Sequence, residues 1–173
     1  MEDGNVLFKQ NRLTDASHRY QYALRRLPSP LPSTSQHRLI FEQLQTHLLL
    51  NLSRCKRKLK LTSEALDLAD QVLKINPVSF EAHYAKAKAN REAGNLHEAV
   101  KNLTEASRVA PQNREVHRII LKIKSEINAA ESKMLILKDH HGSSSREGDS
   151  TSGVDSSGST GSAKEDFDSS LII

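Results

Sequence analysis

The sequence predicts an all-α protein, a solenoid of about three helical hairpins followed by a long capping helix. The first observation is composition, because Leu, Ala, Lys and Glu dominate the first four-fifths of the chain while Gly and Pro are few. The second is a period of 34 residues, which separates Ala65 from Ala99 and Pro77 from Pro111. The third is the helical spacing of apolar residues within each unit. One hairpin cannot bury its apolar face alone, so we expect the hairpins to stack.

An alanine followed by a proline marks each of the three units. Twelve residues separate Ala16 from Pro28, and the same interval recurs in both later units. The alanine lets two antiparallel helices approach closely, and the proline ends the second helix because it lacks an amide hydrogen and has a fixed φ. The predicted segments are residues 1–30 (first repeat), 31–45 (insertion), 46–79 (second repeat), 80–112 (third repeat), 113–138 (capping helix with heptad spacing) and 139–173 (disordered acidic tail).

The first unit carries the most specific pattern. It reads Gly4-Asn5-x-x-Phe8-Lys9, then Ala16, Tyr20, Ala23-Leu24 and Pro28. Together with the 34-residue period, this pattern resembles the tetratricopeptide repeat (TPR). The resemblance implies several more helical residues before Gly4. We therefore expect the chain to be the C-terminal piece of something longer, or a short isoform.

Two segments depart from the repeat. The insertion of residues 31–45 begins with prolines and potential N-capping residues, and its apolar spacing predicts one long helix from Ser35 to Leu59. After Pro111, apolar residues follow in steps of four and three: Val116, Ile120, Ile123, Ile127, Ala130, Met134 and Leu137. We expect the first half of this stripe to cap the solenoid. A coiled coil that dimerises the chain through residues 116–137 is the alternative, and both can hold.

The tail differs in composition and charge from the rest of the chain. Residues 142–163 are mostly Ser, Gly, Thr and Asp, which predicts disorder. Residues 139–173 hold two cations and seven acids, so the preceding part carries a net charge of +9. This basic body predicts an acidic partner, unless the lysines merely solvate helix faces. Leu171 and Ile173 form an apolar-x-apolar C-terminus of the kind that PDZ domains accept by strand addition.

The sequence contains no pattern typical of an enzyme or of a cofactor site. It lacks metal-binding histidine spacings, a phosphate-binding glycine loop and a nucleophile elbow. Cys55 is the single cysteine, which excludes an internal disulfide and fits a reducing compartment. The neighbouring Arg54, Lys56 and Arg57 could lower its pKa. The cysteine nevertheless falls at a small-residue site of a helix that should face its hairpin partner, which predicts a buried structural thiol. No signal peptide or membrane-spanning run is present in the sequence, and we expect a cytoplasmic protein.

We expect a partner to bind along an inner wall formed by the first helix of each hairpin. Cations outnumber acids there, although Glu81 is among the wall residues. Arginine makes bidentate contacts with carboxylates and asparagine can hold a peptide backbone, so the wall suits an extended acidic segment. The predicted binding residues are Asn5, Phe8, Lys9, His47, Leu50, Asn51, Arg54, Arg57, Lys58, Tyr84, Lys88, Arg91, Arg118 and Lys122.

Two other partners were weighed against an acidic segment. In many TPR co-chaperones a clamp of Lys, Asn, Asn, Lys and Arg grips the C-terminal carboxylate of a chaperone, and these roles fall on Met1, Asn5, Asn51, Glu81 and Ala85. The three cations are missing, which disfavours a chaperone adaptor. The basic run of residues 54–60 would suit a nucleic acid, but few aromatic residues accompany it for base stacking.

A closer resemblance covers residues 4–125. The stretches GNVLFKQNRLTDASHRYQYALRRLP, LLLNLSRCKRKL and SFEAHYAKAKANREAGN resemble the TPR block of the TANC and rolling-pebbles scaffolds. The resemblance implies a non-enzymatic cytoplasmic scaffold beneath a membrane, at synapses or at sites of cell adhesion.

Overall fold

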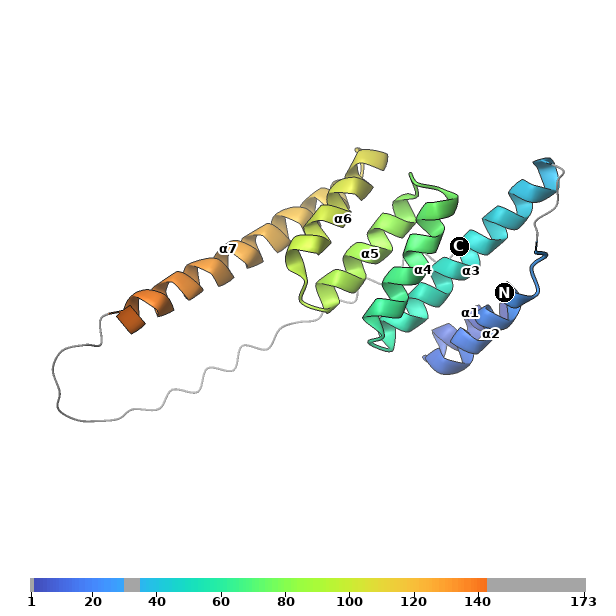
Figure 1. The fold of residues 1–173 in the computed structure, drawn as a ribbon, viewed down its shortest axis with the longest axis horizontal. Helices are drawn as coiled ribbons and strands as arrows, with labels where there is room; N and C mark the ends of the chain where they lie inside the picture. The colour runs from blue at the N-terminus through green and yellow to red at the C-terminus, as the bar shows by residue number, and fades with distance from the viewer. Residues whose placement is uncertain (1, 30–34, 143–173) are drawn as a thin grey trace. The chain divides into compact units, whose positions relative to one another are not determined.

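A computed structural model describes residues 2–29 and 35–142 of the chain. Seven helices and no strand occur in these two ranges, which confirms the predicted all-α fold (Figure 1). The helices are α1 (Glu2–Lys9), α2 (Leu13–Arg25), α3 (Ser35–Lys58), α4 (Thr62–Ile75), α5 (Phe80–Glu92), α6 (Leu96–Val109) and α7 (Arg114–Gly142).

The first six helices form three hairpins. Each of these helices packs against the next one in the chain, and α3 also contacts α5. One residue with a left-handed backbone lies between the two helices of every hairpin: Asn11 at φ 60°, Lys60 at φ 63° and Gly94 at φ 82°. Only the third hairpin uses glycine, the residue that adopts this conformation without steric cost. The three turns therefore share one geometry although their sequences differ.

The 34-residue period is also visible in the contacts of individual atoms. Nε2 of His83 lies 3.2 Å from the carbonyl oxygen of Pro77, and Nε2 of His117 lies 3.0 Å from that of Pro111. The segments that enter α5 and α7 therefore fold in the same way. In this respect α7 is the first helix of a further unit.

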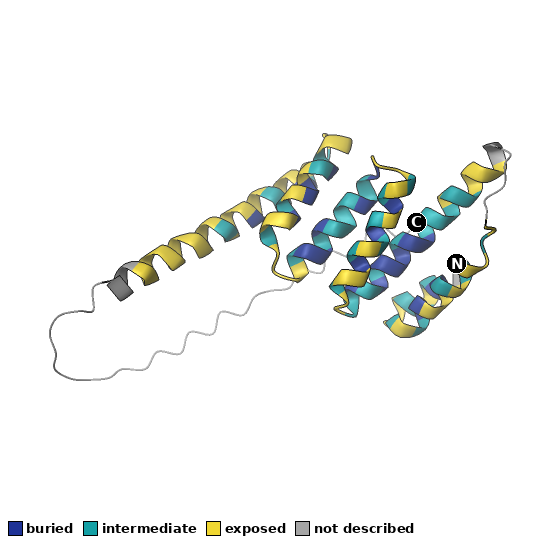
Figure 2. Cartoon of the chain, viewed as in Figure 1, coloured by how far each residue is buried: buried dark blue, intermediate teal, exposed yellow. Residues whose placement is uncertain are grey.

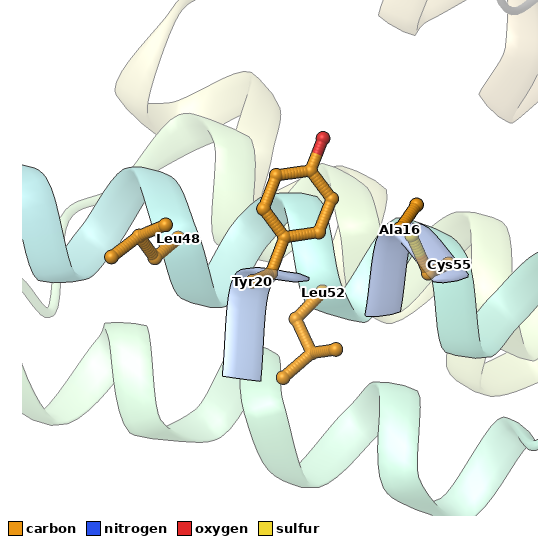
Figure 3. Packing of buried hydrophobic residues seen from close by; sticks show 5 residues of the cluster. All are labelled: Ala16, Tyr20, Leu48, Leu52 and Cys55. Carbon is orange, nitrogen blue, oxygen red and sulfur yellow. The ribbon is translucent and has the colours of Figure 1, made fainter. Parts of the chain in front are cut away.

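Burial of residues follows the predicted repeat, and Figure 2 colours the chain by burial. Ala16, Ala65 and Ala99 are at most 1% exposed, as expected for residues at which two helices approach closely. In the first cluster, Tyr20 and Cys55 pack with Ala16, Leu48 and Leu52 (Figure 3). This cluster joins the first hairpin to α3 of the second.

The inserted residues extend α3 at its N-terminal end. The helix begins at Ser35, and Leu39 and Ile40 near its start are each 55% exposed. Leu44 is half-buried against the first core cluster. The first described turns of α3 thus expose apolar surface, and the remainder serves as the first helix of the second hairpin.

The stripe of α7 is buried in its first half. Val116 and Ile123 are at most 1% exposed and pack in a cluster with Ala99 and Leu103 of α6. This part belongs to a compact unit of residues 1–130. The helix α7 extends to Gly142, beyond the predicted end at residue 138, and its capping role stays a prediction.

A second unit begins at Glu131, and its described part is the helical stretch 131–142. Within this stretch, Met134 and Leu137 are 62% and 59% exposed. The tail from residue 143 onwards, with the predicted disorder and the PDZ-type motif of Leu171 and Ile173, lies outside the described residues. Among the described helices, none has the length and apolar character required to cross a membrane.

Gly4 provides a test of the first hairpin. A Cβ atom at this position would lie 2.6 Å from Cε1 of Tyr20, whose side chain is 2% exposed and cannot easily move. We expect Gly4→Ala to lower the free energy of unfolding by about 1–2 kcal/mol, because the clash outweighs the gain in helix propensity. Chemical denaturation measures the change. Val6→Ala, at a 51% exposed site on α1, should stay within about 0.5 kcal/mol, and an unchanged midpoint for Gly4→Ala would contradict the packing.

Candidate functional site

The candidate site is the face formed by the first helices α1, α3, α5 and α7, which we call the first-helix face. Side-chain contacts join these helices in order. Nδ2 of Asn51 on α3 donates to Oδ1 of Asn5 on α1 at 3.4 Å. Arg57 on α3 pairs with Glu92 on α5. Because the four helices are neighbours, residues at equivalent positions on them lie along one row.

A polar cluster lies at the start of this face. The hydroxyl of Tyr20 donates a hydrogen bond of 2.5 Å to the same Oδ1 of Asn5 that Asn51 contacts. Burial raises the pKa of Tyr20 to about 12, so the hydroxyl stays protonated near neutral pH and remains a donor. The charge of Arg54 acts in the opposite direction and lowers the pKa of Tyr20. Arg54 follows Asn51 by three residues, so it lies one turn further along the same side of α3. The amide of Asn5 is therefore held in one orientation beside a cation.

Ion pairs between successive first helices recur with the repeat period. Arg57 on α3 pairs with Glu92 on α5, and Arg91 on α5 pairs with Glu126 on α7 at 3.3 Å. Both the arginines and the glutamates stand 34 residues apart. We call these two pairs the inter-repeat ladder. It links equivalent points of adjacent repeats.

Between α1 and α3, a different pair of residues occupies the positions that are equivalent to those of the ladder. Allowing for the 15 inserted residues, Phe8 corresponds to Arg57, and Lys58 corresponds to Glu92. Nζ of Lys58 lies 4.9 Å from the centre of the Phe8 ring. A cation–π contact between α1 and α3 thus replaces the ion pair found between the later helices.

The ladder changes the role expected for two of the predicted binding residues. Arg57 is only 8% exposed, so its guanidinium is hardly accessible to a partner. Arg57 thus takes part in the contact between two repeats, and its predicted role in binding a partner stays a prediction. Arg91 is 39% exposed but pairs with Glu126. Both glutamates lie outside the set of predicted binding residues, although their 34-residue spacing marks them as equivalent positions of the repeat.

Three other cations on this face keep part of their side chain exposed. Arg54 and Lys58 are half-buried on α3, and Lys88 is half-buried on α5. Nζ of Lys88 lies 5.6 Å from the centre of the Tyr84 ring, which stacks on Phe80 at 5.7 Å. Two cations of this face thus lie over aromatic rings, Lys58 over Phe8 and Lys88 over Tyr84.

The remaining predicted residues differ in their accessibility. Leu50 is partly buried against the core cluster that contains Leu49, so this side chain contributes to the packing of the fold. His47 is half-buried, and Asn51 is 9% exposed. Three predicted residues are exposed, namely Lys9, Arg118 and Lys122. Arg118 donates to Glu115 on its own helix at 2.9 Å.

The clamp positions are only partly brought together. Asn5 and Asn51 are in contact, as they would be in a carboxylate clamp. The cation positions on α5 hold Glu81 and Ala85, and Oε2 of Glu81 lies 3.3 Å from the hydroxyl of Ser79. The position of Met1 lies outside the described residues. The described part of the clamp therefore carries its two amides and an acid, without a cation.

Cys55 is inaccessible in the first core cluster, as its spacing predicted. Its exposed fraction is 0%, and burial raises the pKa of the thiol to about 11, although Arg54, Lys56 and Lys58 lower it. A protonated, covered thiol is not a nucleophile. Within the described ranges, no group of His, Cys, Asp and Glu side chains could hold a metal ion.

The sequence is similar to part of several known proteins. No protein-family model matches the sequence. The chain is 31% identical over 115 residues to aryl-hydrocarbon-interacting protein-like 1 of Bos taurus, a match that covers 65% of this chain and 35% of that protein. The chain thus spans about a third of the length of the curated relatives that it matches.

Two solved structures show the fold. The C-terminal TPR-containing domain of an FK506-binding protein from Plasmodium falciparum has a TM-score of 0.64 and 28% identity, covering 76% of this chain and 87% of that one. The first TPR domain of Spaghetti (RPAP3), solved with the HSP90 peptide SRMEEVD, has a TM-score of 0.59 and 20% identity, covering 73% and 89%. The described helices therefore have the fold of a TPR domain.

Removing a glutamate of the inter-repeat ladder should destabilise the protein more than removing an exposed glutamate elsewhere. Glu92→Ala would leave the buried Arg57 without its carboxylate partner, and we expect the free energy of unfolding to fall by about 1–3 kcal/mol. Glu98→Ala is the matched control, because Glu98 is 58% exposed and its pair with Lys101 is 3.8 Å long. This change should stay within about 0.5 kcal/mol in the same denaturation experiment. Equal effects of the two substitutions would show that the ladder adds no stability.

Cys55 predicts a loss of stability at alkaline pH. The thiol ionises near pH 9 in the unfolded chain and near pH 11 in the folded protein, so deprotonation favours unfolding. The stability that depends on the protonated thiol is present below pH 9 and is lost as the pH rises towards 11. Denaturation curves across this range should show a steeper fall for the wild type than for Cys55→Ala. Parallel curves would contradict the burial of the thiol.

Proposed function

We propose that this chain is a non-enzymatic adaptor that binds an extended acidic segment of a partner protein along the first-helix face. The observation that carries the proposal is the set of cations held there beside an amide pair. Arg54 and Lys58 lie on α3 and Lys88 on α5, while the acids Glu92 and Glu126 are engaged in the ladder. Arginine and lysine would bind carboxylates, and the amides of Asn5 and Asn51 would hold backbone groups.

The cellular role that we propose is based on the resemblance to the TANC and rolling-pebbles scaffolds. In that setting the chain contributes a binding module to a cytoplasmic scaffold beneath a membrane, at synapses or cell-adhesion sites. Leu171 and Ile173 would engage a PDZ domain. Self-association would use the exposed end of the α7 stripe, from Ala130 to Leu137, since Val116 and Ile123 are already buried.

A chaperone adaptor is the second candidate, and one observation favours it. Asn5 and Asn51 are in contact at the places of the two clamp asparagines. The RPAP3 domain, similar in fold, was solved with an HSP90 peptide. Against this candidate, Glu81 and Ala85 occupy the positions of the clamp cations on α5, and Glu81 would repel a terminal carboxylate.

Binding of labelled peptides to the intact chain tests the proposal. The probe is oligoglutamate with both ends blocked, and oligoglutamine of the same length is the uncharged control. We expect Arg54→Glu with Lys88→Glu to weaken oligoglutamate binding about tenfold or more, measured by fluorescence anisotropy at low salt. The matched variant, Lys101→Glu with Arg108→Glu, reverses two exposed cations of α6 and should bind like the wild type.

Two further probes separate the alternatives. The peptide SRMEEVD with a free C-terminus, compared with its amidated form, detects a carboxylate clamp. Single-stranded oligouridine across a salt series detects a nucleic-acid site, because phosphate contacts make affinity fall steeply with salt. Tight binding of either probe, together with no binding of oligoglutamate, would overturn the proposal. Pull-downs from lysate with the wild type and both double variants would then name the natural ligand.

A further inference from the structure

A row of cations follows the repeat on the first-helix face. Arg54 on α3, Lys88 on α5 and Lys122 on α7 stand at intervals of 34 residues. Arg54 and Lys88 are half-buried, and Lys122 is exposed. Every one of these three helices thus supplies one cation from the same repeat position, and we call the set the cation row.

The inter-repeat ladder fixes the side of the helices on which this row lies. Arg54 precedes Arg57 by three residues, and Lys88 precedes Arg91 by three, so these two row members lie one turn before a ladder arginine on the same side of their helices. On α7, Lys122 lies one turn before the ladder residue Glu126. The ladder joins α3 to α5 and α5 to α7 directly. The row therefore crosses three adjacent helices on the side where they contact one another.

Helix packing determines the spacing along the row. Axes of packed helices lie about 8–10 Å apart, so successive cations of the row are separated by about the same distance. The side chains are long, but they start from backbone positions with this regular interval. The row is thus a series of positive charges with one charge for each repeat.

The conformation of a bound segment can be inferred from this interval. A β-strand presents every second residue to one face, about 6.6 Å apart, which is shorter than the interval between helices. A polyproline II helix has three residues per turn and rises about 3.1 Å per residue, so every third residue returns to the same face after about 9.3 Å. Only the second repeat length matches one charge per helix.

We infer that the first-helix face selects a segment in polyproline II conformation that carries an acidic residue at every third position, with one carboxylate each for Arg54, Lys88 and Lys122. This inference rests on the proposed function and adds the spacing that the partner must have. The ring of Tyr84, 5.6 Å from Nζ of Lys88, lies beside the middle member of the row and restricts its movement.

Peptides of identical composition test the spacing. One blocked, labelled peptide contains three Glu-Pro-Pro triplets, and the other contains the same three glutamates together followed by the six prolines. Both have the same composition and the same charge. We expect the triplet peptide to bind the intact wild-type chain about tenfold more tightly, measured by fluorescence anisotropy at one fixed low salt concentration.

A double-substitution cycle identifies the individual contact. Lys88→Gln should weaken binding of the triplet peptide several-fold, and Lys101→Gln, at an exposed position on α6, should leave it unchanged. When the middle glutamate of the peptide is replaced by glutamine, Lys88→Gln should have no further effect. Thermal denaturation of each variant confirms that it is folded before its affinity is compared.

The outcomes separate this inference from the proposed function. Equal or tighter binding of the clustered peptide would overturn the spacing, while the acidic-segment function would stand if oligoglutamate still binds. An undiminished effect of Lys88→Gln on the glutamine-substituted peptide would overturn the assigned contact. If no acidic peptide binds, the proposed function fails and the inference fails with it.

Discussion

The close approach of helices at three alanines is the constraint on which the other contacts depend. Ala16, Ala65 and Ala99 are at most 1% exposed and occupy the same position in successive hairpins. A larger side chain at any of them would push two helices apart, because protein interiors have no spare volume. The contacts between first helices could then no longer be made. The first-helix face thus depends on the smallest side chains in the repeat.

Much of the fold follows from local features of the sequence. The 34-residue period, the prolines after each unit and the apolar spacing predict the hairpins, because these features act within one or two helices. The burial of Arg57 could not be predicted in this way, since it depends on Glu92 in the next repeat and on how two hairpins stack. The left-handed conformation of Lys60 also depends on its position between two packed helices, because no local residue preference selects it. The ion pairs between successive first helices could not be predicted for the same reason, because each of them joins residues of two different hairpins.

The stripe of α7 shows how one periodic pattern can serve two purposes. Its spacing alone is compatible with a cap or with a coiled coil, and the packing buries only its first half. Ile123 is fully buried in the cluster that contains Ala99 and Leu103, whereas Met134 is 62% exposed. A dimer built on the whole stripe would have to remove Ile123 from that cluster. Only the last turns of the stripe are therefore accessible for contact with another helix.

The inter-repeat ladder has a mechanical consequence. In a solenoid each repeat contacts mainly its neighbours, so the array bends at the interfaces between repeats. The interface between α3 and α5 is held by an ion pair whose arginine is 8% exposed, whereas the interface between α1 and α3 is joined by a cation–π contact and an amide pair. The pair of Arg91 and Glu126 is more exposed, and salt screens such a pair more strongly. Bending stiffness should therefore vary along the array, with the centre rigid at any ionic strength and the end at α7 more compliant as salt rises.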